Sequence, residues 1–473
     1  MELYFDKLYI DGEFVNSHSK ETYNVFSSID EEFYAQIPMG SPDDVTGAVS
    51  AARRAFIDWS SRPIESRLEY LDRIREAIEK RSDEISEVIT HEVGMPIGLS
   101  KKIQCGLALT DISETIQAAS NVNLEERVGN SLIVREPIGV VGAITPWNYP
   151  LHQITAKLAP ALAAGCCVVV KPASQAPISA IILAEIVNQI GLPPGVFNLI
   201  FGPGSEVGEE IVKSEDVDMI SFTGSTNAGR AIGALAAKTV KRVTLELGGK
   251  SANIILDDAD LDRAIGSALN ACFLNSGQTC SALSRLLVPE KLVDEIEGRI
   301  LAEIKKFVVG NPFEKGTRIG PLVSKVQQER VRRYIFSGID DGAKLVVGGA
   351  EQPEGLSKGF YVKPTVFSKV TREMKIAQEE IFGPVLSILE YENDEEAVEL
   401  ANETIYGLSG GVWSQDLDRA LGLARKIRTG QVDINGGSFN PKAPFGGYKQ
   451  SGNGRELGKY GLEEYFEIKA IQT

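Results

Sequence analysis

The chain has 473 residues, of which 43% are hydrophobic and 24% are charged, and its net charge is −16. A single hydrophobic core stops growing at roughly 250–300 residues, so this length predicts two domains or more. The composition excludes disorder, collagen and coiled coil, and the negative charge disfavours binding to nucleic acid or to an anionic membrane surface.

Targeting signals and metal motifs are not evident in the sequence. No segment approaches the roughly 18 consecutive apolar residues of a membrane span, and the acidic N-terminus is unlike a signal peptide. The five cysteines contain no C-x-x-C pair, and the three histidines are too few for a histidine-rich metal centre. We therefore expect free thiols, no metal and a cytoplasmic protein.

The first part of the chain predicts helices and then a parallel sheet. Residues 42–120 place apolar side chains at three- and four-residue intervals, which is typical of amphipathic helices, with Ser41 or Asp43 as the first cap. From residue 138 short apolar runs alternate with helical stretches. The predicted strands are 138–145, 166–171, 196–200 and 218–223, and the predicted helices are 151–164, 177–190, 204–213 and 226–238. This order predicts a doubly wound nucleotide-binding domain with helices on both faces of a parallel sheet.

A second α/β series follows a boundary near residue 247. Its predicted strands are 252–256, 283–288, 384–391, 410–414 and 430–435, and its predicted helices are 260–274, 292–307, 324–340, 394–404 and 417–428. The tail after residue 441 is rich in glycine and lysine, which favours an arm rather than a core element.

Cys280 is the cysteine whose surroundings favour chemistry. It ends the polar, glycine-containing segment NSGQTC, which leaves room for a substrate, whereas an isolated cysteine is more often a small core residue. Cys166 and Cys167 lie in a predicted strand, and Cys272 lies in a predicted helix. A thiolate nucleophile also needs a base or a positive charge supplied from elsewhere.

Three further segments carry candidate polar groups. Glu246, between two leucines and next to glycines, would have a raised pKa if buried, as a general base requires, but it fits equally well as an outward-facing strand residue. Asn148, held between two prolines after a strand, could donate to an oxyanion or simply sit in a turn. Glu380, before an aromatic residue, could accept from ribose hydroxyls or belong to a surface acid pair. The GSTNAG loop at Gly224 lacks the middle glycine of a dinucleotide fingerprint and is a weak signal alone.

Taken in order, PWNYP, FTGST, LELGGK, NSGQTC and EEIFGP, followed by PFGGYKQSGNGRELGKYG, resemble the aldehyde dehydrogenase superfamily. The resemblance runs from about residue 8 to the last residue. It implies two Rossmann-like doubly wound α/β domains plus a β-arm oligomerisation element. The implied dinucleotide-binding domain is residues 1–120 and 139–246, the catalytic domain is 247–440, and the bridging arm is 121–138 and 441–473.

The resemblance also implies an NAD(P)-dependent oxidation of an aldehyde to an acid. Cys280 would attack the aldehyde, Asn148 and the Cys280 N–H would hold the oxyanion, and Glu246 would activate the water that hydrolyses the thioester. Glu456 resembles an acid that moves protons. The arm implies a homodimer or homotetramer.

The cofactor-binding residues that the resemblance implies are Ile144, Thr145, Pro146, Trp147, Lys171, Gly204, Gly208, Gly224, Ser225, Glu380 and Phe382. Ser174 stands where many NAD-preferring members have glutamate. Serine removes the repulsion of a 2′-phosphate and Lys171 supplies a positive charge, so we expect NADP to be accepted as well as NAD.

The substrate is less well defined. Tyr149, Thr279, Ser281 and Phe445 would face it, which favours an apolar or aromatic aldehyde. A coenzyme A-acylating enzyme is an alternative that the glutamate at position 246 disfavours. A cysteine hydrolase would need a histidine near Cys280, and His152, the only one near these motifs, has no evident acid partner. A non-catalytic binding protein on the same fold is a further alternative.

Overall fold

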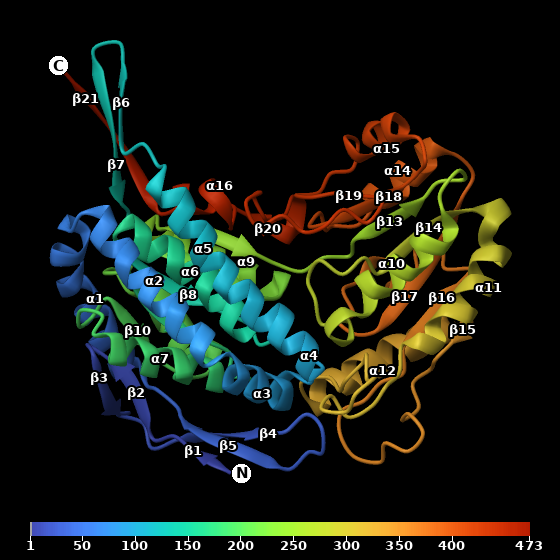
Figure 1. Ribbon diagram of the computed structural model, residues 1–473, viewed down its shortest axis with the longest axis horizontal. Coiled ribbons are helices and arrows are strands. Elements are labelled where there is room, and N and C mark those ends of the chain that lie inside the picture. Colours follow the sequence, from blue (N-terminus) through green and yellow to red (C-terminus); the bar gives the residue numbers. More distant parts are fainter. Residues whose placement is uncertain (1) are drawn as a thin grey trace.

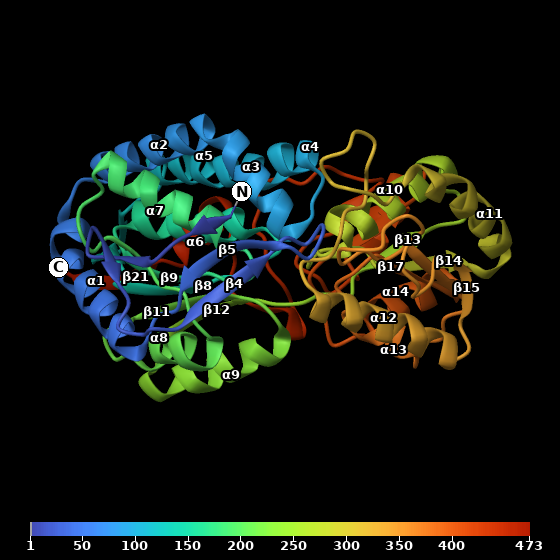
Figure 2. The ribbon, with the colours of Figure 1, turned by 90° about the horizontal axis from the view of Figure 1, so that it is seen from below.

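The computed structural model describes residues 2–473, which form two parallel-sheet domains and a projecting three-stranded sheet (Figure 1). Seen from below, helices lie on both sides of the first sheet, with α2, α5 and α7 on one side and α8 and α9 on the other (Figure 2). This arrangement agrees with the predicted doubly wound architecture. Among the described residues, no helix combines the length and apolarity needed to cross a bilayer. Nor does any group of three His, Cys, Asp or Glu side chains within residues 2–473 have an arrangement that could hold a metal ion.

The first domain contains an eight-stranded sheet in the order β20-β12-β11-β8-β9-β10-β2-β3, and its central strands are parallel. Its strands are β2 (Lys7–Ile10), β3 (Glu13–Asn16), β8 (Val140–Ile144), β9 (Cys167–Lys171), β10 (Phe197–Leu199), β11 (Met219–Thr223), β12 (Arg242–Glu246) and β20 (Gly452–Asn453). Every residue of β8, β9, β10 and β11 is buried, because helices cover both faces. The four predicted strands in this region are therefore present.

The helices of the first domain are α1 (Pro42–Ser61), α2 (Ile64–Lys80), α3 (Ser82–Val93), α4 (Ile97–Leu99), α5 (Gly106–Ser120), α6 (Pro150–Ala164), α7 (Ile178–Ile190), α8 (Glu209–Lys213) and α9 (Thr226–Ala236). Short π-helical or 3-10 turns are η1 (Ser100–Cys105), η2 (Gly204–Gly208) and η3 (Ala237–Thr239). Ser41 caps α1 through a capping box with Asp44. The N-terminal sheet of β1 (Leu3–Tyr4), β4 (Thr22–Phe26) and β5 (Phe33–Pro38) was not predicted.

The second domain contains a seven-stranded sheet in the order β15-β16-β17-β14-β13-β18-β19, in which only β15 is antiparallel. Its strands are β13 (Ala252–Ile255), β14 (Arg285–Pro289), β15 (Lys344–Val347), β16 (Thr365–Ser368), β17 (Val385–Tyr391), β18 (Gly410–Trp413) and β19 (Asp433–Ile434). Successive residues alternate between two apolar clusters on opposite faces, with Leu287 in one and Leu286 and Val288 in the other. Strands β15 and β16 were not predicted, and β19 is shorter than expected.

The helices of the second domain are α10 (Leu261–Phe273), α11 (Val293–Glu303), α12 (Lys325–Asp340), α13 (Lys375–Gln378), α14 (Asp394–Asn402) and α15 (Leu417–Ala424). The accompanying 3-10 turns are η4 (Leu274–Gly277), η5 (Glu290–Leu292) and η6 (Ile304–Lys306).

The projecting sheet has the order β21-β7-β6, with β6 (Glu125–Val128), β7 (Ser131–Pro137) and β21 (Phe466–Gln472). The expectation that the whole tail would be an arm is wrong for the segment before β21. There η7 (Lys449–Ser451) leads into β20, which pairs with β12, and α16 (Gly458–Glu463) buries Leu462 in the core of the first domain. Tail residues therefore lie close to the end of β12.

Candidate active site

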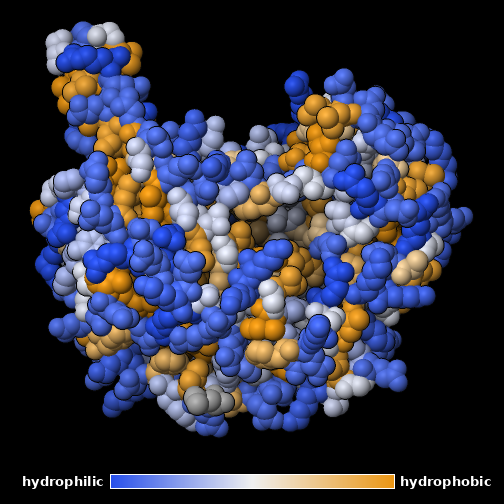
Figure 3. Space-filling model, viewed as in Figure 1, coloured by the Kyte–Doolittle hydropathy of each residue, from blue (hydrophilic) through white to orange (hydrophobic). Residues whose placement is uncertain are grey.

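The carboxyl ends of strands in the first sheet face the loops that precede strands in the second sheet. Asn148 follows β8, and Glu246 ends β12. Cys280 precedes β14, and Glu380 precedes β17. These segments enclose a cavity of about 190 Å³, and the space-filling view shows a hollow between the two domains (Figure 3). The predicted site residues that line the cavity are Pro146, Trp147, Asn148, Gly224, Ser225, Glu246, Cys280, Glu380 and Phe382.

A left-handed turn carries Cys280 into this cavity. After α10, the φ angles of Asn275, Ser276 and Gly277 are 52°, 56° and 75°. A Cβ on Gly277 would lie 2.2 Å from the carbonyl carbon of Gly383, so only glycine fits there. All five cysteines are free; Cys280 is partly exposed, and the other four are buried.

The Cys280 thiol is not a thiolate by default. Burial raises its pKa to about 12, and the nearby carboxylates of Glu380 and Glu246 act in the same direction, against the Ser281 N–H. A nucleophilic step at neutral pH therefore needs a proton acceptor beside the sulfur or a positive charge that arrives with a ligand.

Asn148 is fixed with an amide donor at the cavity. Its Nδ2 donates to the Gln278 carbonyl at 3.0 Å, and its own backbone carbonyl accepts from Gln104 Nε2 at 2.9 Å and from Asn275 Nδ2 at 3.0 Å. The side chain is 2% exposed, and Oδ1 has no partner. Because an amide carries two N–H groups, a second donor is available to a reacting oxygen.

Glu246 presents an unpaired carboxylate. Both of its oxygens are buried without a hydrogen-bond partner. Burial raises its pKa well above the ordinary value, the negative charge of Glu456 adds to the effect, and Lys157 opposes it. An isolated carboxyl group of this kind binds a proton readily, as a general base must.

A buried ion pair lies behind Glu246. Lys157 of α6 pairs with Glu456 and donates to Thr223 Oγ1 at 2.7 Å, and Thr223 lines the cavity. Sequence reasoning named Glu456 but missed Lys157 and Thr223. Lys157 is the one Lys, Arg, Asp or Glu residue of α6, and this was the available signal, because a buried ammonium group needs a partner.

The opposite wall of the cavity comes from the second domain. Glu380 Oε1 accepts from the Gly249 N–H at 3.1 Å, and burial raises the pKa of Glu380 to about 7. A Cβ at Gly248 would lie 2.3 Å from Glu380 Oε2, so glycine there leaves this oxygen accessible. The Trp147 and Phe382 rings meet edge to face at 5.4 Å.

Gln327 and Arg330 of α12 also line this wall and were not predicted. Gln327 Nε2 donates to the Phe382 carbonyl at 2.7 Å, and an Arg330 guanidinium nitrogen donates to the Glu380 carbonyl at 2.8 Å. Nothing in the local sequence distinguishes them from the solvated face of an amphipathic helix.

A second group of predicted residues lies at the end of β9, outside this cavity. Ile144 pairs with Lys171 across β8 and β9, and the Thr145 N–H donates to the Lys171 carbonyl at 3.1 Å. Gly208 faces the Lys171 side chain, which a Cβ there would contact at 3.6 Å. Burial lowers the pKa of Lys171 to about 8. Gly204 faces open space, and Ser174 is partly exposed on the loop after β9.

The expected substrate-facing residues do not line the 190 Å³ cavity. The Tyr149 hydroxyl lies 2.8 Å from Thr279 Oγ1, next to Cys280 in the chain, and Ser281 is partly exposed on the other side of Cys280. Phe445 exchanges two backbone hydrogen bonds of 2.8 Å with Glu456, and its ring contacts Phe439. Tyr149, Thr279 and Ser281 therefore lie close to Cys280, whereas Phe445 is hydrogen-bonded to Glu456.

The expectation that His152 has no acid partner is wrong. Its Nδ1 lies 2.8 Å from a carboxylate oxygen of Asp111, which comes from α5. The pairing follows from the packing of α5 against α6, which the sequence did not reveal.

The residues of both groups fit a dinucleotide. Glu380 offers a free carboxylate oxygen for ribose hydroxyls, and Lys171 offers a buried amine beside a glycine. Ser225 caps α9, whose N-terminal N–H groups are suited to a pyrophosphate.

Comparison with known proteins gives the same picture across the chain. The model of the aldehyde dehydrogenase family matches residues 14–471. A 3-succinoylsemialdehyde-pyridine dehydrogenase from a Pseudomonas species is 48% identical over 99% of this chain and 98% of that protein.

Solved structures agree. A variant of aldehyde dehydrogenase C from Pseudomonas syringae, in complex with NAD+ and octanal, is 47% identical with a TM-score of 0.98, covering 99% of this chain and 96% of that one. A betaine aldehyde dehydrogenase variant from Staphylococcus aureus in complex with NAD+ is 38% identical with a TM-score of 0.95, covering 98% and 95% of the two chains. The similarity therefore includes both domains and the projecting sheet.

Proposed function

Because this chain belongs to the aldehyde dehydrogenase family and is an NAD-dependent enzyme that oxidises an aldehyde to a carboxylic acid, we propose that Cys280 is its nucleophile, Glu246 its general base and Asn148 its oxyanion donor. The observation that carries this assignment is that the three side chains, from two domains, line one cavity.

In the first half-reaction, the Cys280 sulfur adds to the aldehyde carbon once one of the two nearby carboxylates, Glu380 or Glu246, has taken the thiol proton. The second N–H of the Asn148 amide and the Cys280 N–H stabilise the oxyanion of the resulting thiohemiacetal. When bound, the oxidised nicotinamide supplies a positive charge and accepts the hydride that leaves this carbon. A thioester on Cys280 remains.

In the second half-reaction, Glu246 takes a proton from a water that attacks the thioester. Its unpaired and desolvated carboxylate supports this role, and favours hydrolysis over transfer to coenzyme A. The alternative of a cysteine hydrolase gains an acid partner for His152 but is disfavoured, because His152 does not line the cavity that contains Cys280. Glu456, paired with Lys157 behind Glu246, is suited to receive protons from the base.

Two further properties concern the cofactor. Lys171 and Ser174 would face the adenosine ribose, and Glu380 and Gln327 the nicotinamide side. With Ser174 in place of a glutamate and Lys171 nearby, a 2′-phosphate would meet no negative charge, so we expect NADP to be used alongside NAD.

The expected substrate is an apolar or aromatic aldehyde. The aromatic rings of Tyr149 and Phe445 support this expectation, as does the octanal in complex with the Pseudomonas syringae relative. Five free cysteines fit a reducing, cytoplasmic environment.

The projecting sheet is the proposed oligomerisation element. β21 forms an outer edge of its sheet, and Ile468 and Ile471 on it are 69% and 43% exposed. Apolar side chains are visible along the projection (Figure 3). β19 is a short outer strand of the seven-stranded sheet. Pairing of β21 with β19 of a second copy would cover both edges and give a homodimer, or a tetramer built from two dimers.

The test is the appearance of reduced nicotinamide, followed by absorbance, with NAD and NADP in separate assays. The panel contains benzaldehyde, a medium-chain alkanal, betaine aldehyde and succinic semialdehyde, with Cys280→Ser as the control. We expect turnover that the variant loses. Turnover that survives in Cys280→Ser, or that requires coenzyme A, would contradict the proposed mechanism.

A further inference from the structure

The proposed reaction leaves protons in a buried site. In each turnover the Cys280 thiol loses one proton before it attacks, and hydrolysis of the thioester to a carboxylate releases another. Glu246 can hold only one of these, and its side chain is 4% exposed. A route from Glu246 to solvent is therefore needed, and the described residues contain a candidate.

The first part of the route is the ion pair behind Glu246. Lys157 is fully buried, and it joins Glu456 to Thr223, a residue of the cavity wall. Glu456 belongs to the C-terminal segment and Lys157 to α6, so the pair lies where these two elements meet.

The second part is the Asp111–His152 pair, for which the proposed chemistry has no other use. Asp111 accepts from His152 Nδ1 at 2.8 Å and from Thr155 Oγ1 at 2.7 Å, and the Asp111 and His152 side chains are 2% and 14% exposed. Burial disfavours the charged forms of both groups, yet the Asp111 carboxylate outweighs burial at His152, whose pKa is raised. His152, Thr155 and Lys157 all belong to α6, so one helix joins the two pairs, and the charges of Glu456 and Lys157 also act on His152.

The third part is an opening from Asp111 to the surface. Asp111 lines a small cavity of about 10 Å³ with Glu114, Leu457 and Gly461, and this volume fits about one water molecule. Gly461 lies against the backbone of Glu456, because a Cβ there would be 2.7 Å from its carbonyl carbon. The cavity thus has Asp111 on one side and the Glu456 segment on the other.

The small cavity adjoins an open cleft between α5 and α16, which lie side by side (Figure 1). Glu114, Gly458 and Leu462 line both spaces. The cleft has a volume of about 360 Å³, and Lys442, Lys459 and Glu463 are charged groups on its walls. Glu114, whose side chain is 21% exposed, lies at the junction and pairs with Lys442 at 3.8 Å.

We propose that Asp111 and His152 are the outer station of a proton exit path that runs from Glu246 through Glu456 and Lys157 to the cleft between α5 and α16. This inference rests on the proposed function. Glu246 gives the proton it took from water to the Glu456–Lys157 pair. The Asp111–His152 pair then takes it up and releases it through the single water and Glu114 to solvent. No electron moves, and each station returns to its starting charge.

The test separates formation of the thioester from its hydrolysis. p-Nitrophenyl acetate acylates a cysteine thiolate and releases p-nitrophenolate in a burst, and the slower steady rate then reports hydrolysis of the acetyl thioester. His152→Gln and Asp111→Asn should keep the burst and lower the steady rate about ten-fold in dilute buffer, which is less than the roughly 100-fold or greater loss expected for a general base. A high concentration of phosphate or formate should restore the rate, after subtraction of the rate without protein, because a small buffer molecule in the cleft can carry the proton.

The matched control is His18→Gln. His18 Nδ1 lies 2.7 Å from Asp44, so this is also a histidine–aspartate pair, and neither residue lines the two cavities or the cleft of the route. We expect its steady rate and its solvent deuterium isotope effect to match those of the unmodified protein, while His152→Gln shows an increased isotope effect. Glu114→Gln, which changes a partly exposed residue and should fold normally, is expected to lower the rate less and to respond to the same buffers.

Two results would overturn the proposal. One is an unchanged steady rate and isotope effect in folded Asp111→Asn and Glu114→Gln. The other is a lowered rate that buffer does not restore, which would assign the pair a structural role. A protein without any burst that depends on Cys280 would instead contradict the proposed function, so the two failures are distinguishable.

Discussion

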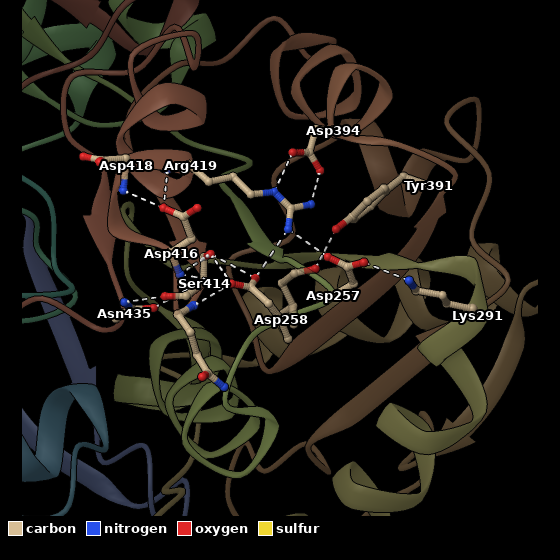
Figure 4. A network of polar contacts seen from close by, with 12 residues as sticks. Asp257, Asp258, Lys291, Tyr391, Asp394, Ser414, Asp416, Asp418, Arg419 and Asn435 are labelled. Atoms are coloured by element: carbon tan, nitrogen blue, oxygen red, sulfur yellow. Dashed lines mark hydrogen bonds and ion pairs between the residues drawn. The ribbon is translucent and has the colours of Figure 1, made fainter.

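Polar side chains lie at the carboxyl ends of both parallel sheets, but those of the second sheet pair with one another, whereas two of those at the first have atoms without a partner. At the carboxyl end of the first sheet, Glu246 has no hydrogen-bond partner and Asn148 keeps a free amide oxygen. At the carboxyl end of the second sheet, Arg419 donates two hydrogen bonds to Asp394, at 2.6 and 2.8 Å, and one to Asp257 at 2.8 Å (Figure 4).

A continuous network of hydrogen bonds and ion pairs connects the polar side chains at the carboxyl end of the second sheet. Lys291 donates to Asp257 at 2.8 Å, and the Asp258 carboxylate accepts from Ser414 and from the Asp416 N–H. Asn435 forms two hydrogen bonds with the backbone of Ser414, at 2.8 and 3.0 Å (Figure 4). The polar groups at this end therefore pair with one another and stabilise the fold.

The comparison shows that topology offers a site that side chains can either open or fill. Ligands bind at the carboxyl ends of strands in doubly wound sheets, and both sheets have such an end. At the first, the Glu246 carboxylate and the Asn148 amide oxygen remain without partners, and unpaired groups cost stability unless a ligand or a reaction uses them.

The largest effect is expected for Glu246, the proposed general base at the carboxyl end of the first sheet. Glu246→Gln should lower the steady rate of aldehyde oxidation about 1,000-fold, because the amide cannot take a proton from water, while the first turnover is retained. Rapid mixing with excess aldehyde would show a burst of reduced cofactor followed by almost no turnover.

The same experiment has a pH dependence of known sign. Glu246 works as a carboxylate, and its pKa is raised by burial, so the steady rate should fall as the pH is lowered through a pKa well above the ordinary value near 4.3. Glu390→Gln, near the carboxyl end of β17, is the control and should behave like the unmodified protein. A profile that is flat from pH 5 to 8 would argue against Glu246 as the base.

Asn148 and Asn435, at the carboxyl ends of the first and second sheets, allow the effects of the same substitution at the two ends to be compared. Asn148→Ala should lower kcat/KM about 100-fold by removing an oxyanion donor, with a small change in stability. Asn435→Ala should leave kcat/KM within about two-fold but lower the free energy of unfolding by about 2 kcal/mol, because it leaves backbone groups of Ser414 unpaired. Steady-state kinetics and urea titration of both variants measure the two effects, and a similar loss of activity in both would remove the distinction.

Breaking the network at the carboxyl end of the second sheet should lower the stability of the protein and leave its activity unchanged. Arg419→Met is expected to lower the free energy of unfolding by about 2 kcal/mol, between the values for exposed and buried ion pairs, because the Arg419 and Asp394 side chains are 31% and 29% exposed. Urea titration followed by circular dichroism measures the shift, and activity at low urea should be unchanged.

Low pH should reduce the difference in unfolding free energy between Arg419→Met and the unmodified protein. Hydrogen bonds from Lys291 and Arg419 hold the pKa of Asp257 at about 2, so its stabilising contribution is present above the unfolded pKa near 3.9 and is lost as the pH falls through 2. The gap between Arg419→Met and the unmodified protein should therefore narrow from pH 4 to pH 2. A constant gap would show that Asp257 contributes little.

The smallest predicted effect concerns the choice between NAD and NADP at Ser174, on the loop after β9. Ser174→Glu should raise the KM for NADP about ten-fold and leave that for NAD nearly unchanged, because the new carboxylate repels a 2′-phosphate. Lys171, with its pKa near 8, is charged below that pH, so any preference for NADP should weaken above pH 8. Gln175→Glu places the same charge on the adjacent exposed residue, and an equal effect there would remove Ser174 as the determinant.

The sequence predicted much of this architecture because fully buried strands have a distinct pattern. Residues 140–144 and 167–170 are apolar throughout, and the alternation with helices determines the order of the sheet. Cys280 and Glu246 were candidates because each stands in a short polar or glycine-rich segment beside an apolar one, and Asn148 because it stands between two prolines after a strand.

Contacts between distant segments were not predictable in this way. Asp111 lies 41 residues before His152 on another helix, and Gln327 and Arg330 reach the cavity only because α12 packs beside the loop at Phe382. The short strands β15 and β16 alternate weakly, and the tail residue Leu462 enters the core within a glycine-rich segment.

The close approach of Gly277 to Gly383 has a consequence for laboratory evolution of this enzyme. Since no side chain fits at position 277, the nucleophile loop and the loop before β17 hold each other at a fixed spacing. Libraries that insert, delete or substitute residues in 275–278 should therefore yield almost no active clones. Diversity aimed at new aldehydes is better placed at Tyr149, Thr279 and Phe445, the proposed substrate-facing residues, which lie outside 275–278.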